Sequence, residues 1–312
     1  MSGFNIISKW KIWFTFSGVA VILSLAAIFM NGFNFGIDFT GGTILDLSFK
    51  QNVTVAQVRE ELKEDGLETS VIQLSGDSFE ESGKNIIIRT KNLSTEESQA
   101  VISHISDGLG DVDVNRIETV GAVIGSEVTQ HTLLNVVLSM AFLVGYMSLR
   151  FEHRIAISAI TAIMHDILMV LGVFAFFRLE IDGSFLAAIL TVLGYSMNES
   201  VVIFDRIREN LHTHKKTDSY EVLANDSIHQ TIRRSCYTLT TTMFAVASLY
   251  FFGGDTTKNF ALVMMIGFIS GAYSSICVAS SLWVKWHERG NSARNRRAPK
   301  KKTVETEETE EI

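Results

Sequence analysis

The pair His165 and Asp166 is the feature of this sequence best suited to chemistry. It lies near the middle of "IAISAITAIMHDILMVLGVFAFF", a run that begins at Ile155 and is otherwise apolar or small. An ionised aspartate at a bilayer centre costs about 2.5–3.5 kcal/mol on insertion scales, so such residues usually face a bundle interior and are functional. Burial disfavours the charged form of a carboxyl group, which favours proton exchange near neutral pH. We expect Asp166 to carry a proton and His165 to tune it or relay from it. The alternatives are a hydrogen-bonded structural aspartate and a packing histidine.

A second set of polar residues lies further along the chain. Glu199 and Arg206 are seven residues apart, which on a helix is two turns, so they share one face about 10 Å from each other. Asn198 and Asp205 have the same spacing on the neighbouring face. A proton carrier needs groups that respond to its charge, and Glu199 with Arg206 could supply them, supported by Asn198 and Asp205. Anchoring of Arg206 at the membrane surface is the alternative.

The elements that must position these residues are membrane spans. The chain has 312 residues, 47% of them hydrophobic, with one proline, and its apolar residues are gathered into long blocks. A run before the first block holds Lys9 and Lys11, but that block is too long for a signal core and no small-residue cleavage site follows, so we expect an anchored helix. Six stretches are long enough to cross about 30 Å of hydrocarbon: 12–31, 129–149, 155–177, 184–204, 236–252 and 259–284.

The distribution of charge predicts the orientation of these spans. Basic residues gather before span one, between spans two and three, between four and five, and after six, so both termini are predicted to be cytoplasmic. The segment 32–128 holds 7 Lys and Arg against 17 Asp and Glu, and its net charge is −10. This acidic segment is therefore expected outside the cell.

The external segment has the pattern of an independent α+β domain. Strand alternation at 43–49, 69–75, 84–90 and 111–120 is interrupted by two helix signatures, Thr54 with Gln57 and Ser94 with Glu97, which are capping-box spacings. The predicted order is β-α-β-β-α-β, the ferredoxin-like arrangement, which carries no function by itself.

The predicted fold is an α-helical polytopic membrane protein with six transmembrane helices and one external α+β ferredoxin-like domain between helices one and two. We expect four parts: the cytoplasmic N-terminus and first helix (1–31), the external domain (32–128), a five-helix bundle (129–290) and a disordered cytoplasmic tail (291–312). The tail is basic and then acidic without apolar runs, which places its basic half near anionic membrane lipid.

Small residues in the sixth span predict close helix packing. Gly267, Gly271 and Ser275 recur at intervals of four residues, a spacing that lets two helices approach closely. We expect this face to pack within the chain or against a partner subunit rather than to form a homodimer.

Enzyme motifs are missing from the sequence. It has no His-Glu-x-x-His pair and no phosphate-binding Gly-rich loop followed by Lys, and its Gly-x-Gly-Asp, at 108–111, lies outside the predicted spans. We expect no enzyme activity, no metal, no cofactor and no nucleic-acid partner, with a proton as coupling ion and sodium as the alternative.

Several motifs resemble the SecD/SecF family of protein-export membrane proteins. They are "FNFGIDFTGGTILDLSF" after the first span, "MHDILMVLGVF", "LTVLGYSMNESVVIFDRIREN", "QTIRRSCYTLTTTMFAV" and "YFFGGDTTKNFALVMMIGFISGAYSSICVAS". The first contains the family signature glycines and aspartate, Gly36, Asp38, Gly41 and Gly42. The match of "DRIRE" favours a coupling role for Arg206. The family usually has Asn-Asp where this chain has Asn198 and Glu199, which lengthens the carboxylate by one methylene.

The resemblance implies a function in protein export at the bacterial inner membrane. It implies a partner subunit SecD, association with the SecYEG channel, contact with translocating unfolded protein, and use of the proton motive force. Two alternatives remain at this point. One is half of a proton-driven exporter of small molecules or lipids, and the other is a structural scaffold of the channel.

Overall fold

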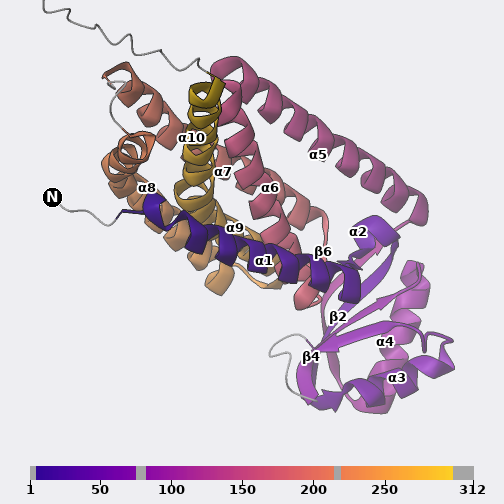
Figure 1. Cartoon of the computed structure of the whole chain (residues 1–312). Helices are drawn as coiled ribbons and strands as arrows, with labels where there is room; N and C mark the ends of the chain where they lie inside the picture. The colour runs from indigo at the N-terminus through magenta and orange to yellow at the C-terminus, as the bar shows by residue number, and fades with distance from the viewer. Residues whose placement is uncertain (1–4, 75–81, 214–218, 298–312) are drawn as a thin grey trace, which may run out of the picture.

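The protein consists of a helix bundle joined to a small domain built on a β-sheet (Figure 1). The structure is a computed structural model that describes residues 5–74, 82–213 and 219–297. In Figure 1 the sheet domain lies at one end of the bundle, and α5 runs along the outside of the bundle. We refer to the two ends of the bundle as the sheet-domain end and the far end.

Long helices make up the bundle. They are α1 (Trp10–Asn31), α5 (Ala122–Arg150), α6 (His153–Phe176), α7 (Gly183–Thr213), α8 (Tyr220–Phe252), α9 (Asp255–Tyr273) and α10 (Ser280–Arg297). A π-helical turn, Ser274–Ala279, joins α9 to α10 so that the two form one continuous rod. A 3₁₀ turn, Ile7–Lys9, precedes α1.

Five helices in the described part of the chain are long and apolar enough to cross a membrane, against the six predicted. They are Ile7–Asn31, Ala122–Arg150, His153–Phe176, Gly183–Thr213 and Thr257–Glu288. The remaining predicted span, 236–252, forms the second half of α8, whose first half is polar and whose second half contains several threonines. This lowers the hydropathy of α8 below that of the other five, so length and composition alone support five spans.

The sheet domain has the element order that the sequence predicted. Strands β2 (Gly42–Thr54), β3 (Val71–Leu74), β4 (Ser82–Thr90) and β5 (Val112–Val120) alternate with α3 (Val55–Glu64) and α4 (Thr95–Leu109). The strands form one antiparallel sheet in the order β3-β4-β2-β5. Both helices begin with the predicted capping boxes, in which Thr54 pairs with Gln57 and Ser94 with Glu97. The apolar core of the domain includes Leu45, Leu47, Val58, Leu62, Ile86, Ile88, Val101 and Ile105.

Several element boundaries differ from the predicted ones, including the end of β2, which lies at Thr54 rather than at residue 49. Helix α5 begins at Ala122, before the predicted start of span two at residue 129, because Gly121 is extended and the chain turns directly from β5 into a helix. Helix α10 continues to Arg297, so residues 291–297, which we expected to be disordered, are helical. The rest of the predicted tail, 298–312, lies outside the described residues.

Short elements connect the two parts of the molecule. Strand β1 (Asn34–Phe35), after α1, pairs in parallel with β6 (Glu180–Ile181), which lies between α6 and α7. Helix α2 (Ile37–Thr40) follows β1 and leads into the sheet. The signature segment therefore lies where the sheet domain meets the bundle.

Candidate functional site

The Asp166 carboxylate is the most completely hydrogen-bonded group inside the bundle. Its Oδ2 accepts from the hydroxyls of Ser196 at 2.6 Å and Ser274 at 2.8 Å. Its Oδ1 accepts from Ser270 Oγ at 2.6 Å and lies 3.1 Å from His165 Nδ1. Only 1% of Asp166 is exposed. A carboxylate has about four lone-pair sites, so these four neighbours use its full accepting capacity.

Close packing of α7 on the last rod brings the serine hydroxyls to Asp166. A Cβ atom on Gly267 would lie 2.3 Å from Val192 Cγ2, and one on Gly271 would lie 3.1 Å from Ser196 Cβ. Ser275 Oγ hydrogen-bonds Ser200 Oγ at 2.9 Å on the same interface. The predicted small-residue face therefore packs within the chain, against α7.

His165 lies beside Asp166, as the sequence placed it, and its second nitrogen is left without a partner. The residue is 8% exposed, and no hydrogen bond to His165 Nε2 is found among the described residues. Its ring lies 6.1 Å from the ring of Tyr273, whose hydroxyl donates to Trp13 O at 3.0 Å. Contact of Nδ1 with a carboxylate oxygen is consistent with a proton on Nδ1, which leaves Nε2 as a lone pair inside the bundle.

Glu199 is also buried but is much less well bonded than Asp166. It follows Ser196 by three residues on α7 and is 2% exposed. Its Oε2 atom has no hydrogen-bond partner in the described part of the chain. Leaving a buried carboxyl oxygen without a hydrogen-bond donor costs free energy, which sets Glu199 apart from Asp166.

The predicted coupling of Glu199 with Arg206 is absent from this conformation. Arg206 turns toward α8, where its Nε donates to Gln230 Oε1 and its guanidinium to Glu209 Oε2, both at 2.5 Å. No hydrogen bond or ion pair joins it to Glu199 within the described residues. The shared helix face is real, but a long side chain near the end of a helix can bond its own turn and the next helix instead.

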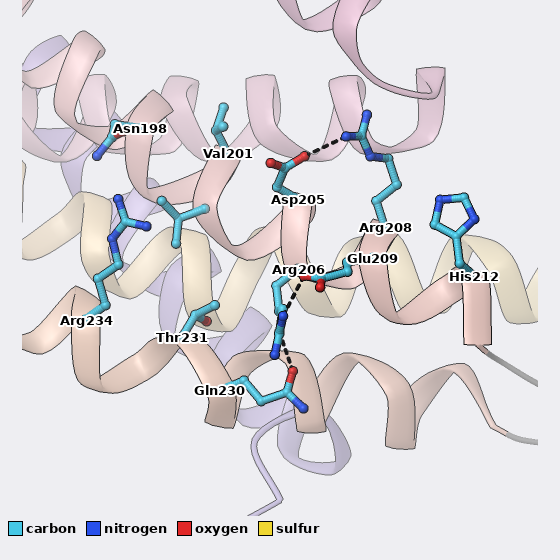
Figure 2. Close-up of a pocket in the computed structure, with 11 residues that line it drawn as sticks. Asn198, Val201, Asp205, Arg206, Arg208, Glu209, His212, Gln230, Thr231 and Arg234 are labelled. Atoms are coloured by element: carbon cyan, nitrogen blue, oxygen red, sulfur yellow. Dashed lines mark hydrogen bonds and ion pairs between the residues drawn. The ribbon is translucent and has the colours of Figure 1, made fainter.

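Arg206 belongs to a polar pocket between α7 and α8, at the far end of the bundle (Figure 2). The pocket has a volume of about 790 Å³. Asp205 lies in it and pairs with Arg150 at 3.1 Å and Arg208 at 3.0 Å. Its lining residues are Asn198, Val201, Val202, Asp205, Arg206, Arg208, Glu209, His212, Gln230, Thr231 and Arg234.

Arg234 is a candidate that the sequence reasoning missed. Figure 2 shows its guanidinium directed away from α8, across the pocket toward Asn198, the neighbour of Glu199 in sequence. It makes no hydrogen bond or ion pair with the other described residues, whereas Arg206 and Arg208 are both paired. The sequence feature that could have identified it is the pair Arg233 and Arg234 before the fifth predicted span. Basic residues at that place were explained by the orientation of the span in the membrane, so no further role was assigned to them.

The signature segment is a structural joint rather than part of the carboxylate site. Asp38 Oδ2 accepts from Gly183 N at 2.7 Å and so caps the first turn of α7. Gly42 has a φ of 126°, and a Cβ there would lie 2.5 Å from Thr90 O. Gly41, at φ 70°, packs against Ala122, and Gly36 packs against Glu180. These contacts join the start of α7, the start of α5 and the sheet.

An ion pair between Arg89 and Glu180 strengthens this joint. Arg89 comes from β4 of the sheet domain and Glu180 from β6, just before α7, and their side chains are only 10% and 15% exposed. Burial raises the pKa of Glu180, and the positive charge of Arg89 opposes that increase. The start of α7 is therefore tied both to the signature segment and to the sheet.

Metal binding has no support in the described part of the chain. Within residues 5–74, 82–213 and 219–297, no three His, Cys, Asp or Glu side chains lie close enough to hold a metal ion.

Comparison with known proteins gives consistent matches along the chain. The family described as "Protein export membrane protein SecD/SecF, C-terminal" matches residues 101–289, and the "SecD/SecF GG Motif" matches residues 26–53. The chain is 45% identical over 290 residues to the protein translocase subunit SecF of Acidaminococcus fermentans, which covers 93% of this chain and 99% of that protein. It is 36% identical over 274 residues to the SecF subunit of Haemophilus influenzae, covering 87% and 82% respectively.

A solved structure extends this similarity to the fold. The crystal structure of SecDF, a translocon-associated membrane protein from Thermus thermophilus, is 32% identical and superposes with a TM-score of 0.83. The match covers 92% of this chain but 39% of the SecDF chain. The chain therefore spans about two-fifths of that longer protein.

Proposed function

The chain belongs to the SecD/SecF family of protein-export membrane proteins, whose SecF members are protein translocase subunits, and we propose that it uses the proton motive force to promote late stages of export. The observation that carries this proposal is Asp166, a carboxylate buried inside a membrane bundle and surrounded by hydroxyl donors from two other segments. Buried ionisable groups of this kind are typical of proton pathways in membrane proteins.

The membrane arrangement that fits this function has six spans. In addition to the five apolar helices, we assign the second half of α8 as a span, because an odd number would place the two termini on opposite sides of the membrane. The distribution of basic residues favours two cytoplasmic termini in the bacterial inner membrane. The sheet domain, which we class as ferredoxin-like from its strand order, then lies outside and the pocket of Figure 2 lies at the cytoplasmic end.

The proposed partner is SecD. The chain matches part of the solved SecDF structure, and its curated relatives are named as SecF subunits. We further propose that the pair acts at the SecYEG channel, and that the external domain contacts translocating unfolded protein.

A proton fits the Asp166 site better than sodium does. Each lone-pair direction of the carboxylate already faces a donor, so a bound sodium ion would require the hydroxyl groups to turn away together. A proton needs only one oxygen. Moving one elementary charge across about 100 mV releases roughly 2.3 kcal/mol, so one or a few protons are enough to bias a rearrangement of a few kcal/mol.

Arg234 is the better candidate for the cation that responds to Glu199. Arg234 lines the far-end pocket, as does Asn198, the neighbour of Glu199 in sequence. Among the described residues neither Arg234 nor Glu199 Oε2 has a hydrogen-bond partner, whereas Arg206 is held by Gln230 and Glu209. Two groups without fixed partners can form and break an ion pair as the proton load changes. We therefore assign Arg206 a structural role at this end of the bundle.

Late-stage export in vesicles tests the proposal. The Asp166→Asn variant keeps the size of the side chain but cannot carry a proton, so it is expected to insert and bind SecD normally while losing the gradient-dependent part of export. The control is export without an imposed gradient, which should not change.

Full response of Asp166→Asn to the proton gradient would exclude the carrier role and favour a scaffold. Export that responds to a sodium gradient would show that sodium, rather than a proton, is the coupling ion. Copurification with a second exporter half, without SecD or SecYEG, would favour a small-molecule or lipid exporter.

A further inference from the structure

The protonation of Asp166 requires a hydrogen-bond rearrangement that one serine is placed to perform. Three serine hydroxyls donate to the carboxylate, and His165 Nδ1 is a fourth donor when it carries the ring proton. A protonated carboxyl group has gained a donor of its own. Two donors cannot share one hydrogen bond, so at least one neighbour must become an acceptor when the proton arrives.

We propose that Ser274 is the positioning residue that lets Asp166 take up and release a proton in place, an inference that rests on the proposed role of Asp166 as a proton carrier. Ser274 Oγ donates to Asp166 Oδ2 at 2.8 Å and lies 3.2 Å from Gly271 O. Its single hydroxyl hydrogen therefore has two acceptors within reach. In the described part of the chain, the Ser196 and Ser270 hydroxyls have one hydrogen-bond partner each, Asp166.

The step balances without any further reactant. A proton binds Asp166 Oδ2, and the new O–H donates to Ser274 Oγ. The Ser274 hydroxyl hydrogen turns from Oδ2 to Gly271 O, so the serine oxygen changes from donor to acceptor. Ser196 continues to donate to the remaining lone pair of Oδ2, and Ser270 continues to donate to Oδ1. Release of the proton reverses these changes.

The local backbone explains why this serine differs from the other two. Ser274 is the first residue of the π-helical turn Ser274–Ala279, where the regular hydrogen-bond spacing of the rod changes. Gly271 has no side chain and packs close to Ser196, so its carbonyl lies beside the site. π-Turns inside helices often occur at functional sites, because they change which carbonyls are available.

Few titratable groups in the described part of the chain face Asp166. His165 is its neighbour on α6, Tyr195 and Glu199 are the nearest such groups along α7, and Tyr273 and Cys277 lie on the last rod. Helix α1 contributes Ser17, which hydrogen-bonds Tyr273 at 2.9 Å. Within the described residues, His165 is the only one of these titratable groups in contact with the carboxylate.

Infrared titration of the full chain, purified with its partner in lipid vesicles, measures this proton directly. The carbonyl band of protonated Asp166 is identified by its loss in Asp166→Asn, and its pH midpoint is compared between Ser270→Ala and Ser274→Ala. Ser270 donates to Oδ1 in both forms, but its hydrogen bond to the charged carboxylate is the stronger one, so its removal should move the midpoint to higher pH by about one unit. Ser274 donates to the charged form and accepts from the protonated one, so its removal should move the midpoint less than half as far.

The rate of gradient-driven export distinguishes the two serines a second time. Ser274→Ala removes the acceptor for the new O–H and should slow the gradient-driven part about tenfold, whereas Ser270→Ala should slow it less. The matched control is Ser158→Ala on α6, a fully buried serine whose hydroxyl donates to Arg154 O at 2.8 Å, away from Asp166. It should leave both the midpoint and the rate unchanged. Thermal unfolding and partner binding are measured for every variant.

The inference is overturned if Ser274→Ala has the midpoint shift of Ser270→Ala, or if it exports at the wild-type rate. Either result would make Ser274 an ordinary donor. Failure of the carrier role itself has a different signature, namely gradient-driven export by Asp166→Asn or an infrared spectrum in which no titrating band depends on Asp166.

Discussion

The two buried carboxylates of the bundle, Asp166 and Glu199, differ in how the fold satisfies them. Asp166 is contacted by three serine hydroxyls and by His165 Nδ1, from three segments, whereas Glu199 Oε2 has no partner among the described residues. Both are almost fully buried, at 1% and 2% exposure. Equal burial therefore does not give two carboxylates in a bundle the same environment. The hydrogen-bond donors around each one decide how well its charged form is stabilised.

This difference suggests separate roles for the two ends of the pathway. The hydroxyl donors around Asp166 stabilise a charge inside the bundle and join three helical segments. Glu199 has no comparable support, and its neighbour in sequence, Asn198, lines the pocket that also contains Arg234, which has no partner among the described residues. In the proposed mechanism the first site holds a charge and the second changes partners.

Substitution of Glu199 is expected to have the largest effect on export, and it tests the contrast between the two carboxylates. Glu199→Gln removes the titrating group and is expected to reduce gradient-driven export by at least about tenfold. Glu199→Asp, the residue the family usually has, retains a carboxylate and should keep most of the activity. Export in vesicles with an imposed proton gradient measures both variants. A severe loss in Glu199→Asp would mean that the surrounding bundle is built around the longer side chain.

The two arginines of the far-end pocket give the next effect. Arg234→Gln is expected to lower gradient-driven export about fivefold to tenfold, because a cation that couples to Glu199 is lost. Arg206→Gln removes side-chain bonds to Gln230 and Glu209 near the surface and should stay within about twofold. The same export assay compares the two variants at equal amounts of assembled protein. Greater sensitivity of Arg206 would restore the pairing suggested by the helix spacing.

Helix packing around Asp166 gives the smallest of the three effects. A Cβ on Gly267 would clash with Val192, so Gly267→Ala should destabilise the protein by about 1–3 kcal/mol and loosen the α7 contact that brings Ser196 to Asp166. Thermal unfolding in detergent measures the change. Gly194→Ala on α7 is the matched control, because a Cβ there meets nothing within 4 Å. Equal unfolding midpoints for the two variants would show that the bundle can relax at Gly267.

Local sequence signals predicted the secondary structure of the sheet domain well. The capping boxes at Thr54 and Ser94 depend on residues three positions apart, and both form as predicted. Strand alternation depends on neighbours two positions apart and gave the four strands with small differences at their ends. Such signals need no tertiary information. The number of membrane spans was predicted less well. The polar half of α8 and its threonines lower its hydropathy, so five helices qualify by length and composition where six spans were predicted.

The candidate site was predictable only in part. The pair His165 and Asp166 is adjacent in sequence, so its chemistry was visible at once. Ser196, Ser270 and Ser274 were not singled out, because they lie 30, 104 and 108 residues from Asp166 and serine is common in helices. The regular spacing of Gly267, Gly271 and Ser275 was the available signal, since it predicted a close helix contact without identifying the facing helix.

The sequence by itself determined that this chain is a membrane protein of the SecD/SecF family, with a titratable pair in an apolar helix and a separate α+β domain. Those properties depend on composition, periodicity and motifs, which are local or simply additive along the chain. The tertiary structure decided which donors reach Asp166, that Arg206 bonds away from Glu199, and that Arg234 has no partner among the described residues. These outcomes depend on side-chain directions and on how closely helices approach, and both are set by packing between segments far apart in the chain.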